Sequence, residues 1–352
     1  MTATRNKITR RSFLEASVGG AFCSMPTNAQ AKPDLKTVRS RADWQKARRQ
    51  VLDGMQLVMG KLQRFDGVET GMEWYEESTI EDLPTFSRIK IRYQAALDDW
   101  VPAYLLTPKN LKRPAPAMLC LHQTTKIGKD EPAGLGGNPN LQYAKELAER
   151  GYVCIVPDYP YLGENNFDPY QHGYASCTMK GIVNHIRAVD LLQSLPQVLP
   201  NRIGAIGHSL GGHNTLFVAA FDQRIRALVT SCGFTSFRKY YNGDLTGWSG
   251  VRYMPRIAET YGKDPARMPF DFPQILVSLA ARPLFINAPL HDANFEVSGV
   301  QDCVAAAMPI YRDIFNARDS LVAIYPDAGH EFPAQVRKQA WTFLDRWLRP
   351  AK

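Results

Sequence analysis

Short runs of β-forming residues alternate with longer helical stretches from Phe86 onward, and this alternation limits the possible folds more than any other feature. Pro, Gly or Asp bounds each short run, as expected of strands. Strands that alternate with helices predict an α/β fold, with a mostly parallel central sheet and helices on both faces. The loops that follow such strands meet at one edge of the sheet, where an open α/β sheet holds its ligand. The predicted strands are 89–93, 101–106, 117–122, 152–156, 203–207, 227–231, 284–288 and 321–325, and the predicted helices include 141–150 and 178–195.

A serine lies at the sharpest predicted turn of this pattern. Gly207-His208-Ser209-Leu210-Gly211 joins the strand 203–207 to a helix predicted over 212–220. A serine hydroxyl is a weak nucleophile unless a tight turn exposes it beside a general base, and flanking glycines leave room for that turn. The five-residue pattern is common by chance, so its position between strand and helix carries the argument. We predict that Ser209 is a catalytic nucleophile.

The partners of such a serine follow it along the chain as an acid and then a histidine. His330 comes directly after the last predicted strand, and we expect it to act as the general base. Asp292 follows the preceding strand and is the expected orienting acid. Asp302 is expected inside the next helix, and Asp327 is too close to His330 in sequence to reach behind it, so both are weaker candidates.

Two backbone N–H groups are needed to bind the negative charge that develops on the substrate oxygen. The residue after the nucleophile, Leu210, is expected to supply one of them. The loop after the strand 117–122 is expected to supply the other, from Gln123 or Thr124. We expect His122 to brace this loop.

The loop at His122-Gln123, the Gly207–Gly212 motif and the ordered Asp292 and His330 resemble the α/β-hydrolase superfamily over about residues 85–350. Within it the chain is similar to the branch of dienelactone hydrolases and bacterial acetyl esterases. That resemblance implies an ester of a small acyl group, or a sugar ester, as the substrate. Dienelactone hydrolases carry Cys where this chain has Ser209, and their oxyanion loop has Gly where this chain has Gln123.

The N-terminus resembles a twin-arginine export signal. Arg10 and Arg11 precede the short apolar run 16–25, and Ala29-Gln30-Ala31 has the small side chains of a cleavage site. The run is too short to span a bilayer, so no permanent membrane anchor is expected. We therefore predict export through the twin-arginine machinery to the periplasm or the medium.

Processing would leave five cysteines, which are scattered along the chain. An odd, scattered set does not indicate a disulfide framework, although a single disulfide stays open. Folding in the reducing cytoplasm before export is compatible with free thiols.

We divide the chain into a signal peptide at 1–31, an N-terminal extension at 32–84 with a helix over 42–63, and a catalytic domain at 85–352. An insertion at about 233–275 is rich in aromatic residues and interrupts the catalytic domain. It is either an aromatic core beneath a long loop or a platform for substrate. The pattern leaves both interpretations open.

Several other functions are excluded or disfavoured. The net charge is +8, but the first 31 residues contribute +3 and the rest holds no long basic run, so no nucleic-acid partner is expected. The segment 128–130 lacks the residues of a phosphate-binding loop, and 134–137 does not join a strand to a helix as a dinucleotide site does. His208 and His213 do not have the spacing of a helical zinc pair. We expect neither cofactor nor metal.

The sequence thus predicts an exported serine carboxylic ester hydrolase with an acyl-serine intermediate, acting on acylated carbohydrates or other small-acyl esters. One alternative is a serine peptidase of the same fold. Such peptidases usually carry a large extra domain, for which the roughly 50 residues after the signal are too few. A second alternative is a non-catalytic protein that binds ligand through the aromatic insertion.

Overall fold

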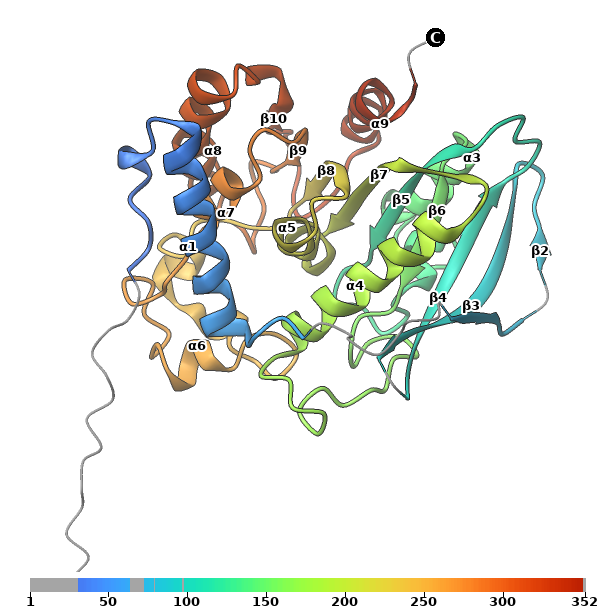
Figure 1. Ribbon diagram of the computed structural model, residues 1–352, viewed down its shortest axis with the longest axis horizontal. Helices are drawn as coiled ribbons and strands as arrows, with labels where there is room; N and C mark the ends of the chain where they lie inside the picture. The colour runs from blue at the N-terminus through green and yellow to red at the C-terminus, as the bar shows by residue number, and fades with distance from the viewer. Residues whose placement is uncertain (1–30, 64–72, 79, 97, 351–352) are drawn as a thin grey trace, which may run out of the picture.

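The computed structural model describes residues 31–63, 73–78, 80–96 and 98–350 (Figure 1). The predicted signal peptide lies outside the described residues, apart from Ala31. None of the helices in these ranges has the length and apolar character needed to cross a membrane.

One mixed sheet runs through the molecule in the order β1-β3-β4-β6-β5-β7-β8-β9-β10, with β2 paired to β3. The strands from β6 to β10 are parallel, whereas β1, β3 and β4 form an antiparallel edge that joins β6. All eight predicted strands are present, and the predicted α/β-hydrolase fold is confirmed. The strands are β1 Trp74–Glu76, β2 Glu81–Asp82, β3 Phe86–Ala96, β4 Asp99–Pro108, β5 Ala115–Leu121, β6 Val153–Pro157, β7 Val198–His208, β8 Ile225–Ser231, β9 Leu284–Asn287 and β10 Leu321–Ile324.

Helices cover both faces of the sheet because the strand side chains are apolar on both faces. In β5, Leu119 and Leu121 enter the core beneath α1, α4, α5, α7 and α8, while Met118 and Cys120 enter the core beneath α3 and α9. This alternation is the two-residue period of a strand buried on both sides. The helices are α1 Arg41–Met59, α2 Asp130–Ala133, α3 Tyr143–Glu149, α4 Cys177–Ser194, α5 Leu210–Phe221, α6 Arg256–Glu259, α7 Phe272–Ser278, α8 Val297–Pro309 and α9 Ala334–Leu348.

The N-terminal extension contributes α1, close to the predicted helix 42–63. Ser40 caps the helix by accepting the backbone N–H of Asp43 at 3.1 Å, and Gly60 ends it at a φ of 97°. Val51 and Met55 are fully buried on the face toward α7. Burial of each such side chain contributes about 2 kcal/mol, so α1 is a structural part of the body. Figure 1 shows α1 lying along α7.

The aromatic insertion lies between β8 and α7 and contains only short helical turns and α6. Phe237 is fully buried, with its ring 5.4 Å from Phe272 and 5.8 Å from Trp248. Asp271 caps α7 by accepting the N–H of Phe272 at 2.7 Å, and it also accepts the N–H of Phe237 at 2.9 Å. One buried carboxylate therefore ties the end of the insertion to its beginning.

Candidate active site

Ser209 occupies a strained elbow between β7 and α5. Its backbone has a φ of 52° and a ψ of −118°, a conformation that L-residues rarely adopt. A side chain on Gly211 would place a Cβ atom 1.8 Å from the carbonyl oxygen of Leu121, and one on Gly207 would meet the Gly211 carbonyl at 2.2 Å. Only glycine fits at these two positions, which explains the pattern around the serine. The elbow raises Ser209 above the sheet edge.

His330 and Asp292 are hydrogen-bonded to each other, as the predicted acid–base pair requires. His330 Nδ1 lies 2.9 Å and 3.0 Å from the two carboxylate oxygens of Asp292. Oδ1 of Asp292 also accepts the backbone N–H groups of Asn294 at 2.8 Å and Phe295 at 3.1 Å. Because an ionised carboxylate only accepts, Nδ1 of His330 carries the proton, and Nε2 is left free to accept one.

The surroundings of Asp292 keep it ionised. Burial alone would raise the pKa of this carboxyl, but the hydrogen bond of His330, the charge that this ring carries when protonated, and the two backbone donors hold its pKa below the ordinary value. The two weaker acid candidates lie elsewhere. Asp327 bonds the exposed His291 at 2.8 Å, and Asp302, inside α8 as expected, pairs with Lys239 at 2.9 Å.

Ser209 and His330 open onto one pocket of about 380 Å³, which Leu210, Gln123 and Thr124 also line. Asp292 lies behind His330 and does not reach the pocket surface. The pocket brings together residues that follow β5, β7, β9 and β10, because these parallel strands end at the same edge of the sheet.

The loop after β5 is held rigidly, as expected of a loop that presents backbone donors. Nε2 of His122 accepts the N–H of Tyr159 at 2.9 Å, so its Nδ1 carries the proton and donates to the Gln123 carbonyl at 2.6 Å. The side chain of Gln123 donates to Glu131 at 2.9 Å. The hydroxyl of Thr124 lies 2.9 Å from that of Tyr253. His122 braces the loop as predicted.

The aromatic insertion forms one wall of this pocket through Tyr240, Trp248 and Tyr253. The packed ring of Phe237 confirms the aromatic core, whereas the platform for substrate stays a prediction. Phe295, which follows Asp292 closely in sequence, extends this wall, with its ring 5.9 Å from that of Tyr240 and 6.0 Å from that of Trp248. Its position in the sequence, three residues after the predicted acid Asp292, is the signal that could have identified Phe295 as a pocket residue.

His213 also lines the pocket, and the sequence analysis considered it only as a rejected zinc ligand. It lies four residues after Ser209 on α5, so both side chains share one face of the helix. Burial lowers its pKa to about 3, and the backbone of Gly233 opposes this only in part, so the ring is neutral. Neither ring nitrogen makes a hydrogen bond of normal geometry to the described residues. The ring packs 4.7 Å from that of Trp248.

One group of three potential metal ligands occurs in the described part of the chain: His208, Cys232 and His330, whose ligand atoms lie within 4.8 Å of one another. Each has a protein partner. Nδ1 of His208 lies 2.9 Å from the hydroxyl of Ser231, the Cys232 thiol donates to the Glu331 carbonyl at 3.3 Å, and His330 is bonded to Asp292. These contacts brace the loop that carries His330. Within the described ranges all five cysteines are free thiols and buried.

Several known proteins resemble this chain in sequence or in fold. The Bacillus subtilis (strain 168) protein YtaP, a hydrolase by name, is 27% identical over 261 residues, which cover 70% of this chain and 83% of YtaP. Among solved structures, a glucuronoyl esterase from Solibacter usitatus aligns over 90% of this chain and 97% of its own, with 17% identity and a TM-score of 0.71. Acetyl xylan esterase 1 from Thermoanaerobacterium sp. JW/SL YS485 covers 93% of this chain and 99% of its own, with 15% identity and a TM-score of 0.55.

These structural likenesses confirm the α/β-hydrolase fold, and the narrower assignment to the dienelactone hydrolase branch stays a prediction. The sequence profile of one family matches residues 140–350, more than half of the chain, including the elbow serine, its acid and its histidine. The chain therefore belongs to the prolyl oligopeptidase family of the α/β-hydrolase superfamily.

Proposed function

We propose that the protein is a serine carboxylic ester hydrolase that works through an acyl-serine intermediate. One observation carries the proposal: a serine on a strained elbow and a histidine already paired with an ionised acid line the same pocket. These are the nucleophile, the base and the orienting group of this chemistry. No cofactor takes part in the proposed reaction.

In the first half of the reaction, the hydroxyl of Ser209 attacks the ester carbonyl and gives its proton to Nε2 of His330. Asp292 stabilises the imidazolium that results. The backbone N–H of Leu210 and one from Gln123 or Thr124 bind the negative charge on the carbonyl oxygen. His330 then protonates the leaving alcohol, which departs and leaves the acyl group on Ser209.

Water completes the turnover by the same steps in reverse order. Nε2 of His330 takes a proton from water, and the resulting hydroxide oxygen attacks the acyl carbon. The second tetrahedral intermediate collapses as His330 returns the proton to the Ser209 oxygen. The carboxylic acid leaves, and the enzyme is restored.

We infer that the substrate is an ester of a hydroxyl-rich alcohol, such as an acylated carbohydrate. The half-buried rings of Tyr240 and Tyr253 line the pocket and offer flat apolar faces on which a sugar can stack. His213 lines the pocket and is neutral, and its ring nitrogens, buried in the free protein, make no hydrogen bond of normal geometry; a small opening of the pocket would let one of them bond a substrate hydroxyl. The two solved neighbours described above are by name esterases of glucuronoyl and acetyl xylan substrates, which supports the same class.

A serine peptidase is the second candidate, and the family match favours it. An acyl-serine mechanism cleaves amides as well as esters. Turnover of an aryl acetate without turnover of a peptide anilide supports the esterase. The opposite preference supports the peptidase.

We further propose that residues 1–31 direct export by the twin-arginine route. The Arg10-Arg11 pair, the apolar run and the Ala29-Gln30-Ala31 site support this. Replacement of both arginines by lysine should retain the protein in the cytoplasm of a bacterial host. Unchanged periplasmic delivery would reject the route.

The nucleophile is tested by intact-mass labelling with a fluorophosphonate, applied to the wild type and to Ser209→Ala. We expect one adduct on the wild type, none on the variant, and loss of ester turnover in parallel. A wild type that binds acetylated sugars but takes no label would favour the non-catalytic alternative. Labelled wild type and labelled variant together would move the nucleophile to another residue.

A further inference from the structure

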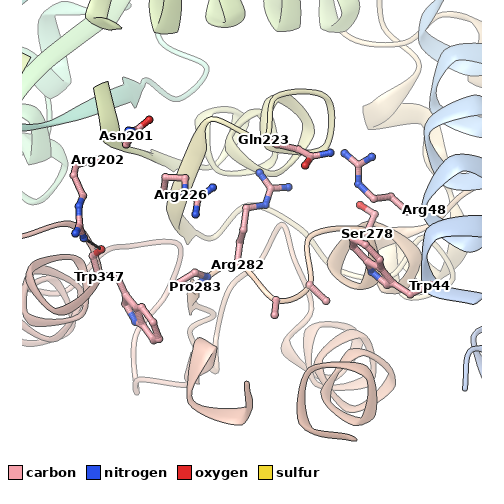
Figure 2. A pocket seen from close by; sticks show the side chains of 12 residues that line it. Trp44, Arg48, Asn201, Arg202, Gln223, Arg226, Ser278, Arg282, Pro283 and Trp347 are labelled. Carbon is pink, nitrogen blue, oxygen red and sulfur yellow. Dashed lines mark hydrogen bonds between the residues drawn. The ribbon is translucent and has the colours of Figure 1, made fainter. Parts of the chain in front are cut away.

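A second pocket, of about 520 Å³, lies at the opposite edge of the sheet from Ser209 (Figure 2). Asn201 and Arg202 line it from the beginning of β7, Arg226 from the beginning of β8, and Pro283 directly precedes β9. Ser209 and Asp292 instead follow the ends of these parallel strands. This volume is within the range of small-ligand sites.

Among the described residues, four arginines line this pocket, and no aspartate or glutamate does. They are Arg48, Arg202, Arg226 and Arg282, and none has a carboxylate within 4.0 Å in the part of the chain that the structure describes. Figure 2 shows the guanidinium of Arg282 between those of Arg226 and Arg48. Four cations therefore share one cavity without a neutralising side chain.

The pKa of Arg282 shows how the neighbouring positive charges act on this guanidinium group. Burial, and to a smaller extent the charges of Arg48 and Arg226, lower the pKa of Arg282 to about 10, while Tyr311 and Asp222 act in the opposite direction. The Asp222 carboxylate is itself held by Arg224 at 2.7 Å. An added anion in the pocket would relieve the repulsion that remains.

Capping of α5 explains two of the arginines but not the group. Arg282 donates to the carbonyls of Ala219 and Asp222 at 2.6 and 3.1 Å, and Arg48 donates to Ala220 at 2.6 Å, so both cap the C-terminal end of α5. Main-chain carbonyls fix these guanidinium groups but do not neutralise them.

The other two arginines, Arg202 and Arg226, do not cap α5. Arg226 is exposed and makes no hydrogen bond to a described residue, and Arg202 bonds only the carbonyl of Trp347, at 3.2 Å. Arg202 thus caps the C-terminal end of α9, and the side chain of Arg226 is the one that capping does not explain.

We propose that this pocket is a binding site for a ligand that carries two or more oxyanion groups, such as phosphates or carboxylates. Guanidinium groups bind both kinds of oxyanion through paired, charge-assisted hydrogen bonds. Trp44 and Trp347 stand at opposite sides of the pocket and provide apolar walls (Figure 2). The same chemistry would suit a small free polyanion or an acidic oligosaccharide. The site is independent of the proposed hydrolase activity.

Titration calorimetry of the full chain at low salt tests the proposal with three probes: pyrophosphate, citrate and a galacturonate trisaccharide. The variants are Arg226→Gln and Arg48→Gln. Arg49→Gln is the matched control, because Arg49 neighbours Arg48 on α1 and is exposed but does not line the pocket. Loss of one charge-assisted contact should weaken binding about tenfold in each pocket variant. The control should bind like the wild type.

Tight binding of pyrophosphate or citrate identifies a small free anion, whereas binding of the trisaccharide alone identifies an acidic sugar. The proposal fails if no probe binds the wild type. It also fails if Arg226→Gln and Arg48→Gln bind as tightly as the wild type, or if Arg49→Gln weakens binding equally. Ester turnover, measured beside each titration, should be unchanged in all three variants because the pocket is remote from Ser209.

Discussion

Mild acid should destabilise this protein through three buried histidines. His185, His208 and His213 are each almost fully buried, and burial lowers the pKa of each to about 3. In the unfolded chain the same side chains have pKa values of about 6.5. The folded state therefore keeps them neutral over a pH range in which the unfolded state binds protons.

The sign and size of the effect follow from proton linkage. Folded pKa values below the unfolded ones mean that stability is complete above about pH 6.5 and falls as the pH decreases toward 3. At about pH 5 each unfolded histidine has bound nearly one proton more than its folded counterpart. Each histidine then costs about 2 kcal/mol relative to pH 8, and stability changes by about 1.4 kcal/mol per pH unit. Three such sites cost about 6 kcal/mol, comparable with the whole stability of many domains.

Urea unfolding, followed by tryptophan fluorescence between about pH 4.5 and 8, measures this dependence. His213→Phe places an aromatic ring beside Phe217 and Trp248, and His185→Leu removes a second titrating group. Each variant should flatten the slope near pH 5 by about 1.4 kcal/mol per pH unit, which corresponds to one proton. His172→Gln, at an exposed position, serves as the control.

The control should keep the wild-type slope because its side chain is exposed and the substitution leaves the three buried rings unaltered. Equal slopes in the wild type and both buried-site variants would refute the reasoning. That result would mean that the buried rings take up protons while the protein stays folded.

Three further predictions concern the site. Asp292→Asn should lower kcat/KM for an aryl acetate by about 10⁴, because the amide reverses the tautomer of His330, while the circular dichroism spectrum stays native. His213→Phe should raise KM for an acetylated xylobiose about tenfold and leave aryl acetate kinetics unchanged; equal effects on both substrates would argue against contact with a sugar hydroxyl. Gly211→Ala should cost about 3 kcal/mol in urea unfolding, because its Cβ would collide with the Leu121 carbonyl; wild-type stability would contradict the elbow geometry.

The site was predictable where local pattern and chain order act together. Ser209 is flanked by glycines that sterics require, and Asp292 and His330 each follow a strand that ends at the same sheet edge. His213 was missed because its role depends on what covers it. Only the folded insertion shows that its ring lies beneath Trp248 in the pocket.

The fold was predictable in its strands but not in every pairing. The eight strands carry enough β-branched and aromatic residues to be recognised, whereas β1 and β2 have only three and two residues and depend on pairing with β3. The direction of β4 is set by a tight connection that pairs Ala96 with Asp99, a local geometry that hydrophobic periodicity does not report. The arginine pocket was beyond sequence analysis because its residues come from five distant segments.

The carboxylate of Asp271 holds the two ends of the aromatic insertion together, so the segment between them is free to vary in evolution. It accepts hydrogen bonds from both the beginning of the insertion and the first turn of α7, so one carboxylate holds the two ends of the intervening chain together. We expect changes of length or sequence between Phe237 and Asp271 to remodel this wall of the pocket without displacing the elbow or the bonded Asp292 and His330. Evolution, or a protein engineer, could exchange this module to alter selectivity while the reaction chemistry is inherited intact.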